Sequence, residues 1–233
     1  MKQLQVRGLN RRRVEQLLSK TKHLDSIGER IEALSRCFVG HPYTSNPLIG
    51  SPDTPEVLVA SLDGFDCVTF IETILALARA SNVDDFAARL RRIRYKKGWV
   101  QWNRRNHYTT NWILNNSLER IVMLLSIRGV PAITRQRFLN VVPGLAPVRA
   151  SIRCVPKRTV PRLESRLQTG DVIFFASTKE NLDVFHGGII VRDGAGLLMR
   201  HASRSARRVV EQELHDFLKG NRMAGVIVVR PQG

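Results

Sequence analysis

The chain has 233 residues, of which 43% are hydrophobic, and its 37 Lys and Arg against 20 Asp and Glu give a net charge of +17. A chain of this length and apolar content can pack a large core without a disulfide or a structural metal. No run of about 18 apolar residues is present, which excludes a transmembrane helix of ordinary length. The positive charge favours contact with a polyanion, and nucleic acid, anionic lipid and acidic cell-wall polymer all qualify.

The first half of the chain predicts helices. Apolar residues recur at helical spacing from Val14 to Leu34, with a break at residues 22–26, which predicts one or two amphipathic helices. A loop rich in Pro and Gly follows at residues 41–56. Three further helices are expected, over residues 66–80, over residues 82–95 with Asn82 as the cap, and over residues 113–129.

The second half predicts strands. Short apolar runs rich in β-branched and aromatic residues are separated by Gly, Asp and Ser, as is typical of an antiparallel sheet. One further helix is expected over residues 210–218. Helices followed by strands favour the α+β class over alternating βαβ units. The expected strands lie in residues 146–155, 171–177, 186–193, 196–203 and 226–230.

The three cysteines differ in their surroundings. Cys37 and Cys154 lie in apolar segments that are typical of core thiols, and no CxxC pair indicates a zinc site. Cys67 follows Asp66, a good helix cap, and would occupy the first turn of an apolar helix. The helix end lowers a thiol pKa, so a thiolate nucleophile is one interpretation. A buried structural thiol is the other.

Two of the six histidines could serve such a nucleophile. His186 opens one expected strand and His201 ends the next, and residues 192–196 between the strands predict a hairpin turn. If residues 190–191 face residues 197–198, the histidines are cross-strand neighbours with Cβ atoms about 5 Å apart. One imidazole could then orient the other, which favours a Cys–His–His catalytic site. A Cys/His/His metal site stays open as an alternative.

The stretch "FDCVTFIE" at residues 65–72 resembles the nucleophile motif of the NlpC-type cysteine peptidases, papain-like hydrolases of the bacterial cell wall. The N-acetylmuramoyl-L-alanine amidase-like branch is the closer match, and the resemblance runs over residues 39–218. It implies a papain-like α+β fold in which the nucleophile helix packs on an antiparallel sheet. It also implies one amidase domain over residues 1–233, with residues 1–38 as an N-terminal helical extension.

The resemblance implies roles for individual residues. Cys67 would be the nucleophile, His186 the base and His201 the polar residue that orients it. Tyr43 matches a loop tyrosine that contacts the catalytic centre in relatives. Four further residues are candidates for substrate binding: Asp66, Trp99, Trp102 and Tyr108. The three aromatic rings could stack on sugar or peptide, or they could pack the loop.

The function expected from the resemblance is hydrolysis of a peptidoglycan amide, either the lactyl–L-Ala bond or a stem-peptide bond, with no cofactor. Peptidoglycan or muropeptides would be the partners, and the basic surface could hold an anionic polymer. An acyltransferase or deamidase acting on lipid or protein amides is the alternative, followed by a basic nucleic-acid-binding protein. The N-terminal segment lacks the apolar run of a Sec signal. Action in the periplasm or cell wall would then need a specialised secretion system, unless the start is truncated.

Overall fold

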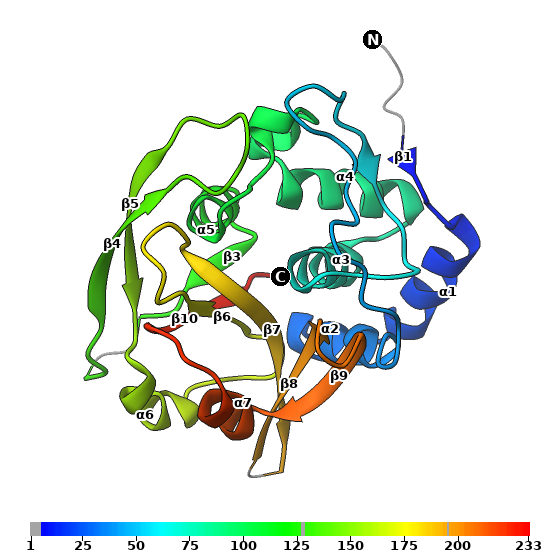
Figure 1. The fold of residues 1–233 in the computed structure, drawn as a ribbon. Helices are drawn as coiled ribbons and strands as arrows, with labels where there is room; N and C mark the ends of the chain where they lie inside the picture. Colours follow the sequence, from blue (N-terminus) through cyan, green and yellow to red (C-terminus); the bar gives the residue numbers. More distant parts are fainter. Residues whose placement is uncertain (1–5, 127–128, 195) are drawn as a thin grey trace.

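The computed structural model describes residues 6–126, 129–194 and 196–233 and has a mixed α+β architecture around a six-stranded sheet (Figure 1). Every neighbouring pair of strands in this sheet is antiparallel. The expected α+β class is therefore confirmed. In spatial order the strands are β3 (Val122–Leu124), β10 (Gly225–Pro231), β6 (Val172–Ala176), β7 (Val184–Asp193), β8 (Gly196–Ser203) and β9 (Arg208–Glu213).

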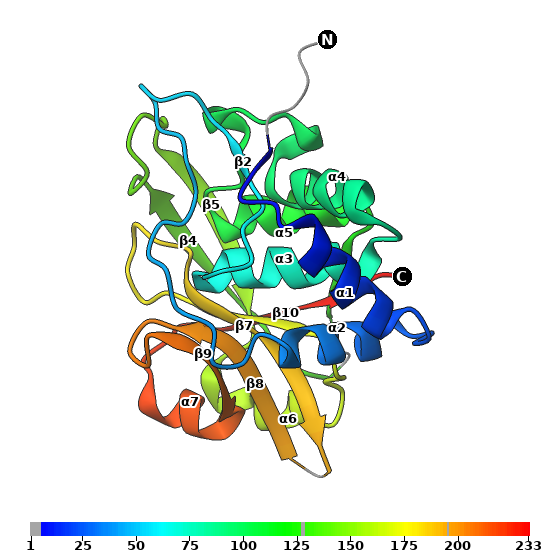
Figure 2. The ribbon, with the colours of Figure 1, turned by 90° about the vertical axis from the view of Figure 1, so that its right-hand side faces the viewer.

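Helices cover both faces of the sheet. One face packs against α1 (Arg11–Thr21), α2 (Ile27–Arg36), α3 (Cys67–Arg79), α4 (Val83–Arg94) and α5 (Thr109–Leu118). The other face packs against α6 (Pro161–Glu164) and α7 (Leu214–Gly220), and Figure 2 shows the two layers on either side of the strands. Strand β6 is buried along its whole length because its alternate side chains enter the two cores.

The helices predicted from Val14 to Leu34, over residues 66–80 and over residues 82–95 are confirmed as α1 to α4, with Asn82 as the cap of α4. Asn82 accepts a hydrogen bond from the backbone of Asp85 at 2.9 Å, and Ser26 caps α2 in the same way through Glu29. Helices α1 and α2 contribute side chains such as Val14 to the core around α3, so this segment packs as part of the main body. No helix among the described residues is long and apolar enough to cross a membrane.

Two expected helices are wrong in part. The segment after Leu118 turns at Arg120, whose φ is +53°, and then joins the sheet as the edge strand β3 beside β10. The expected helix over residues 210–218 begins only at Leu214, because residues 208–213 pair with β8 as the edge strand β9. The end of the first of these predictions, at residues 127–128, lies outside the described residues.

Smaller elements complete the chain. A second antiparallel pair joins β5 (Val148–Cys154) to β4 (Ile133–Leu139), a strand that the sequence did not reveal. Strands β1 (Val6–Arg7) and β2 (Leu58–Val59) form a short parallel pair. Three short 3₁₀ helices are η1 (Lys96–Gly98), η2 (Trp102–Arg104) and η3 (Lys157–Thr159).

Candidate active site

Cys67 is the first residue of α3 and is held there by a capping box. The Asp66 carboxylate accepts a hydrogen bond from the Thr69 backbone N–H at 2.8 Å, and the Asp66 N–H donates to the Thr69 hydroxyl at 3.0 Å. From Thr69 to Ala78 the helix is buried, so its first turn has little freedom to move. Cys67 itself is half-buried. The sequence therefore places a partly accessible thiol at a fixed point, and the Asp66 carboxylate is used in fixing it.

The Cys67 thiol is protonated at neutral pH, which corrects the expected thiolate. Burial raises the pKa of Cys67 to about 12, and the nearby Asp66 carboxylate adds to the rise. The backbone N–H groups of Gly187, Cys67 and Val68 act in the opposite direction, as expected for a helix end, but they do not outweigh the desolvation. A base must therefore remove the proton during any reaction at this sulfur.

Strand β7 brings its backbone directly to the thiol. The backbone N–H of Gly187 acts on the Cys67 thiol, whose pKa it lowers against the effect of burial, and Gly187 is the residue after His186. A Cβ atom at Gly187 would lie 2.7 Å from the ring of Phe174 and 3.1 Å from Ile71 of α3. Only glycine therefore lets α3 pack this closely on the strand.

The two histidines form a pair. Nε2 of His186 lies 2.7 Å from Nδ1 of His201. The pairing of β7 with β8 places Ile189 opposite Arg200, so His201 lies opposite Gly188 and the histidines are diagonal neighbours on one face. The expected direct opposition is wrong by two residues, and a slip of two keeps both side chains on the same face.

Helix α7 forms the wall behind this pair. The ring of Phe217 stacks on His186 at 5.4 Å and meets His201 edge-on at 5.6 Å. Nε2 of His201 lies 3.4 Å from the side-chain oxygen of Gln212 on β9. The sequence reasoning missed both residues because it assigned residues 210–218 to a helix. Strand alternation over residues 208–213 would have indicated Gln212.

Both imidazoles are neutral at physiological pH. Burial lowers the pKa of His186 to about 3, and the neighbouring His201 adds to the fall. Burial also lowers the pKa of His201, although the hydrogen bond with Gln212 opposes it. With Nε2 of His186 facing His201, Nδ1 is the nitrogen left to accept a proton from a thiol.

Acid should destabilise the fold through His186. An unfolded imidazole binds a proton below about pH 6.5, whereas folded His186 stays neutral to about pH 3. The free energy of unfolding should therefore fall as pH is lowered through this window, by up to about 1.4 kcal/mol per pH unit, and should not change above it. Urea denaturation at several pH values measures the slope, and His186→Asn should reduce it. An equal slope in the variant would contradict the assignment.

Tyr43 reaches the same place from the loop before α3. Its backbone pairs with Phe65, two residues before Cys67. Burial raises the pKa of Tyr43, and the nearby Cys67 and Asp66 contribute to the rise. The structure therefore brings Tyr43 beside the candidate nucleophile.

The three aromatic residues expected to stack on substrate differ in exposure. Trp99 is 59% exposed, with the Arg104 guanidinium 6.0 Å from its ring. Trp102 is half-buried, and Arg105 lies 4.6 Å from its ring centre. Tyr108 is buried, and its hydroxyl accepts a hydrogen bond from the Val141 N–H at 3.1 Å. Tyr108 therefore packs the loop and offers no ring face to a ligand.

The donor set does not indicate a metal. Over residues 6–126, 129–194 and 196–233, no three His, Cys, Asp or Glu side chains gather closely enough to hold an ion. His186 and His201 use one ring nitrogen each on the other. The geometry offers a thiol, a neutral imidazole with one free nitrogen, and a second imidazole that fixes its orientation. This set is suited to nucleophilic attack on a carbonyl carbon.

Comparison with known proteins assigns the chain to a family. Residues 33–226 match the family model AmiA-like, described as N-acetylmuramoyl-L-alanine amidase-like, while no curated protein sequence matches. A crystal structure from Legionella pneumophila, of family DUF1460, superposes with a TM-score of 0.85 at 20% identity, covering 96% of this chain and 94% of that one. An N-acetylmuramoyl-L-alanine amidase from Bacteroides uniformis superposes with a TM-score of 0.79 at 25% identity, covering 89% and 99%. With most of its length matched, the chain belongs to the AmiA-like family of N-acetylmuramoyl-L-alanine amidase-like proteins.

Proposed function

We propose that this protein is a cysteine-dependent amidase that hydrolyses the lactyl–L-Ala amide of bacterial peptidoglycan, on a papain-like core of the NlpC type. The observation that carries the proposal is the position of Cys67 at the start of α3, where the backbone N–H of Gly187 acts on its thiol. Gly187 directly follows His186, which lies 2.7 Å from His201. The family and the Bacteroides uniformis amidase support the choice of bond.

The reaction begins from a neutral thiol and a neutral imidazole. As the Cys67 sulfur attacks the amide carbon, its proton moves to Nδ1 of His186, and the carbonyl oxygen becomes an oxyanion. The backbone N–H groups of the first turn of α3 have no acceptors within the helix and can stabilise that oxyanion. His201 keeps the His186 ring in position through the 2.7 Å contact.

The second half of the reaction releases both products. His186 passes its proton to the leaving amine nitrogen, the C–N bond breaks, and the acyl group stays on Cys67 as a thioester. A water molecule then gives a proton to His186 and attacks the thioester carbon. The carboxylic acid leaves, and the sulfur regains its proton from His186.

Peptidoglycan lies outside the cytoplasm, so we place the action in the periplasm or cell wall, with a specialised secretion system as a route of delivery. The net charge of +17 suits contact with an acidic wall polymer. An acyltransferase or deamidase built on the same residues would also form a thioester at Cys67. Such an enzyme would pass the acyl group to another acceptor or release ammonia.

Mass spectrometry of digested peptidoglycan tests the proposal. Purified enzyme should release peptides with a free L-Ala amine and leave glycan strands with a free lactyl carboxyl group. Products cut within the stem peptide would instead identify an endopeptidase. If no new amine appears in either position, the proposed function is wrong.

A further inference from the structure

A turn rich in arginine lies beside the candidate nucleophile. Residues 204–207 connect β8 to β9, and Figure 2 shows this turn on the same side of the molecule as the N-terminus of α3. The Tyr43 N–H donates to the Arg207 carbonyl oxygen at 2.9 Å, and Tyr43 also pairs with Phe65. Phe65 lies two positions before Cys67 in the chain. The turn is therefore linked through Tyr43 to the segment that enters the nucleophile helix.

The backbone of the turn is fixed in an unusual conformation. Arg207 has a φ of +56°, in the left-handed region where glycine or asparagine is the usual choice. The Ser203 hydroxyl holds the other end by accepting a hydrogen bond from the Ala206 N–H at 3.2 Å. An arginine at a strained position suggests that its side chain, rather than the backbone, is what the site needs.

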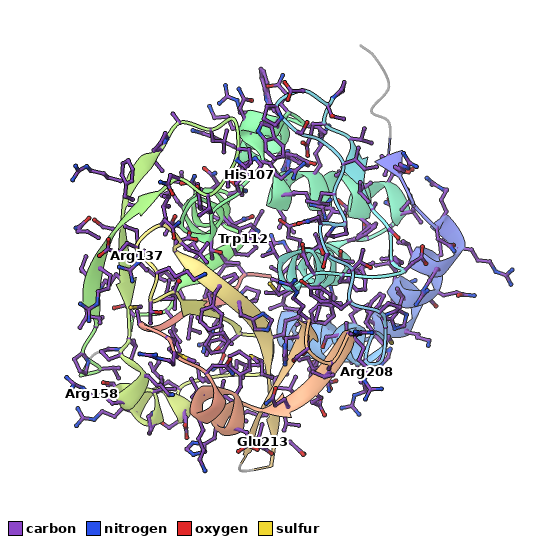
Figure 3. All side chains as sticks on the ribbon, in the orientation of Figure 1. His107, Trp112, Arg137, Arg158, Arg208 and Glu213 are labelled. Carbon is purple, nitrogen blue, oxygen red and sulfur yellow. The ribbon has the colours of Figure 1, made fainter. Side chains whose placement is uncertain are left out.

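The guanidinium groups of this turn have no acidic partner. Arg204, Arg207 and Arg208 are exposed, and among the described residues none of them forms a side-chain hydrogen bond or an ion pair. Figure 3 labels Arg208 at the start of β9. By contrast, the buried Arg200 on β8 is paired with Glu211 at 2.5 Å. Three like charges without a counterion make a site for an anion from outside the chain.

The position of the turn indicates which chemical class of anion it would bind. The Tyr43 N–H binds the Arg207 carbonyl oxygen at 2.9 Å, and the charge of Arg204 opposes the rise in the Tyr43 pKa that burial causes. An anion held here would thus lie beside the atoms that contact the scissile amide. Guanidinium groups bind planar carboxylates through two parallel hydrogen bonds. In a peptide amide substrate the anion would be a carboxylate on a residue close to the bond that is cut.

We propose that the Arg204–Arg208 turn is a carboxylate-binding rim that makes the enzyme select substrates with a free carboxylate near the scissile amide. The inference rests on the proposed amidase function and adds a specificity to it. Stem peptides whose second residue is linked through its side chain carry such a carboxylate, and amidation of that residue removes it. The rim would therefore distinguish the free acid from the amidated form.

Two muramoyl dipeptides that differ only at this group provide the test. In both, the γ-carboxyl group of the second residue is blocked as the methylamide, so that no other carboxylate is present. One is N-acetylmuramoyl-L-alanyl-D-isoglutamine γ-methylamide, and the other carries the free α-carboxylate in place of the α-carboxamide. The wild-type enzyme should cleave the free acid with a kcat/KM roughly 10-fold or more above that of the amide, since a charge-assisted hydrogen bond is lost with the amide. The variant Arg204→Gln/Arg207→Asn should lose most of this preference, through a higher KM for the free acid alone.

Controls separate the possible outcomes. Asparagine is chosen at residue 207 because it tolerates a positive φ. Arg158→Gln, an exposed change in η3, should keep the full preference. Equal rates on both dipeptides in wild type and variant would overturn the rim while leaving the amidase intact. Failure to cleave either dipeptide or whole peptidoglycan would overturn the proposed function and the rim with it.

Discussion

Replacing Cys67 with alanine should lower the kcat/KM for peptidoglycan hydrolysis by roughly 10³-fold or more, because no other group of the site can form the thioester. The fold should be unaffected, since alanine is the best helix former and Cys67 is only half-buried at the first position of α3. Release of soluble fragments from purified peptidoglycan measures the activity, and thermal unfolding followed by circular dichroism measures the stability.

A second cysteine provides the matched control. Cys37 is exposed at the end of α2, where its sulfur lies 3.3 Å from the Ala33 carbonyl oxygen. Cys37→Ala should therefore keep wild-type activity, which also excludes a general effect of removing a thiol. Wild-type rates in Cys67→Ala would remove Cys67 from the mechanism and leave the His186–His201 pair without a nucleophile.

The candidate site residues could be picked out in the sequence because each lies at a recognisable local position. Asp66 before an apolar run predicts a helix start, and this places Cys67 on the first turn whatever lies around it. His186 and His201 flank a hairpin, so they share one end of it even though the register differs by two residues from the expected one. A helix cap and a hairpin turn are set by neighbouring residues, so both can be recognised in the sequence.

The protonation of Cys67 and the packing around the histidines could not be predicted in the same way. The helix end alone favours a Cys67 thiolate, whereas burial by segments far away in the chain keeps the thiol protonated. Phe217, which packs behind the histidines, belongs to a helix that begins only at Leu214, four residues later than the pattern suggested. These effects depend on tertiary contacts, which no local window of sequence contains.

The missed strands have a similar cause. Strands β3 and β9 are the edges of the sheet, and each is paired on one side only. Val122 pairs with Pro231, more than a hundred residues away, and the helical spacing around it gave a competing interpretation. By contrast, β6 is buried on both faces, and its unbroken apolar run could be assigned without knowing its partners.

Breaking the ion pair beneath the nucleophile helix should cause the largest loss of stability. Glu72 of α3 and Arg94 of α4 are each 3% exposed at the side chain, with Nε and Oε2 separated by 2.6 Å. The Trp112 indole N–H donates to Glu72 at 3.2 Å, and Figure 3 labels Trp112 between α5 and α3. Arg94 also donates to the Val59 carbonyl oxygen at 2.6 Å. Glu72→Gln should lower the free energy of unfolding by about 3–5 kcal/mol, since it leaves a buried guanidinium without a counterion.

Urea denaturation of the two single variants and a double variant separates the cost of an unpaired charge from the cost of altered packing. Arg94→Met leaves the carboxylate unpaired instead and should cost a similar amount. The double variant Glu72→Leu/Arg94→Met removes both charges and should recover most of the loss, because well-packed apolar residues often replace a buried pair without penalty. Asp84→Asn breaks the fully exposed pair with Arg11 and should leave stability almost unchanged. If the double variant is as unstable as the sum of the single ones, the loss comes from packing around α3 and α4 rather than from an unpaired charge.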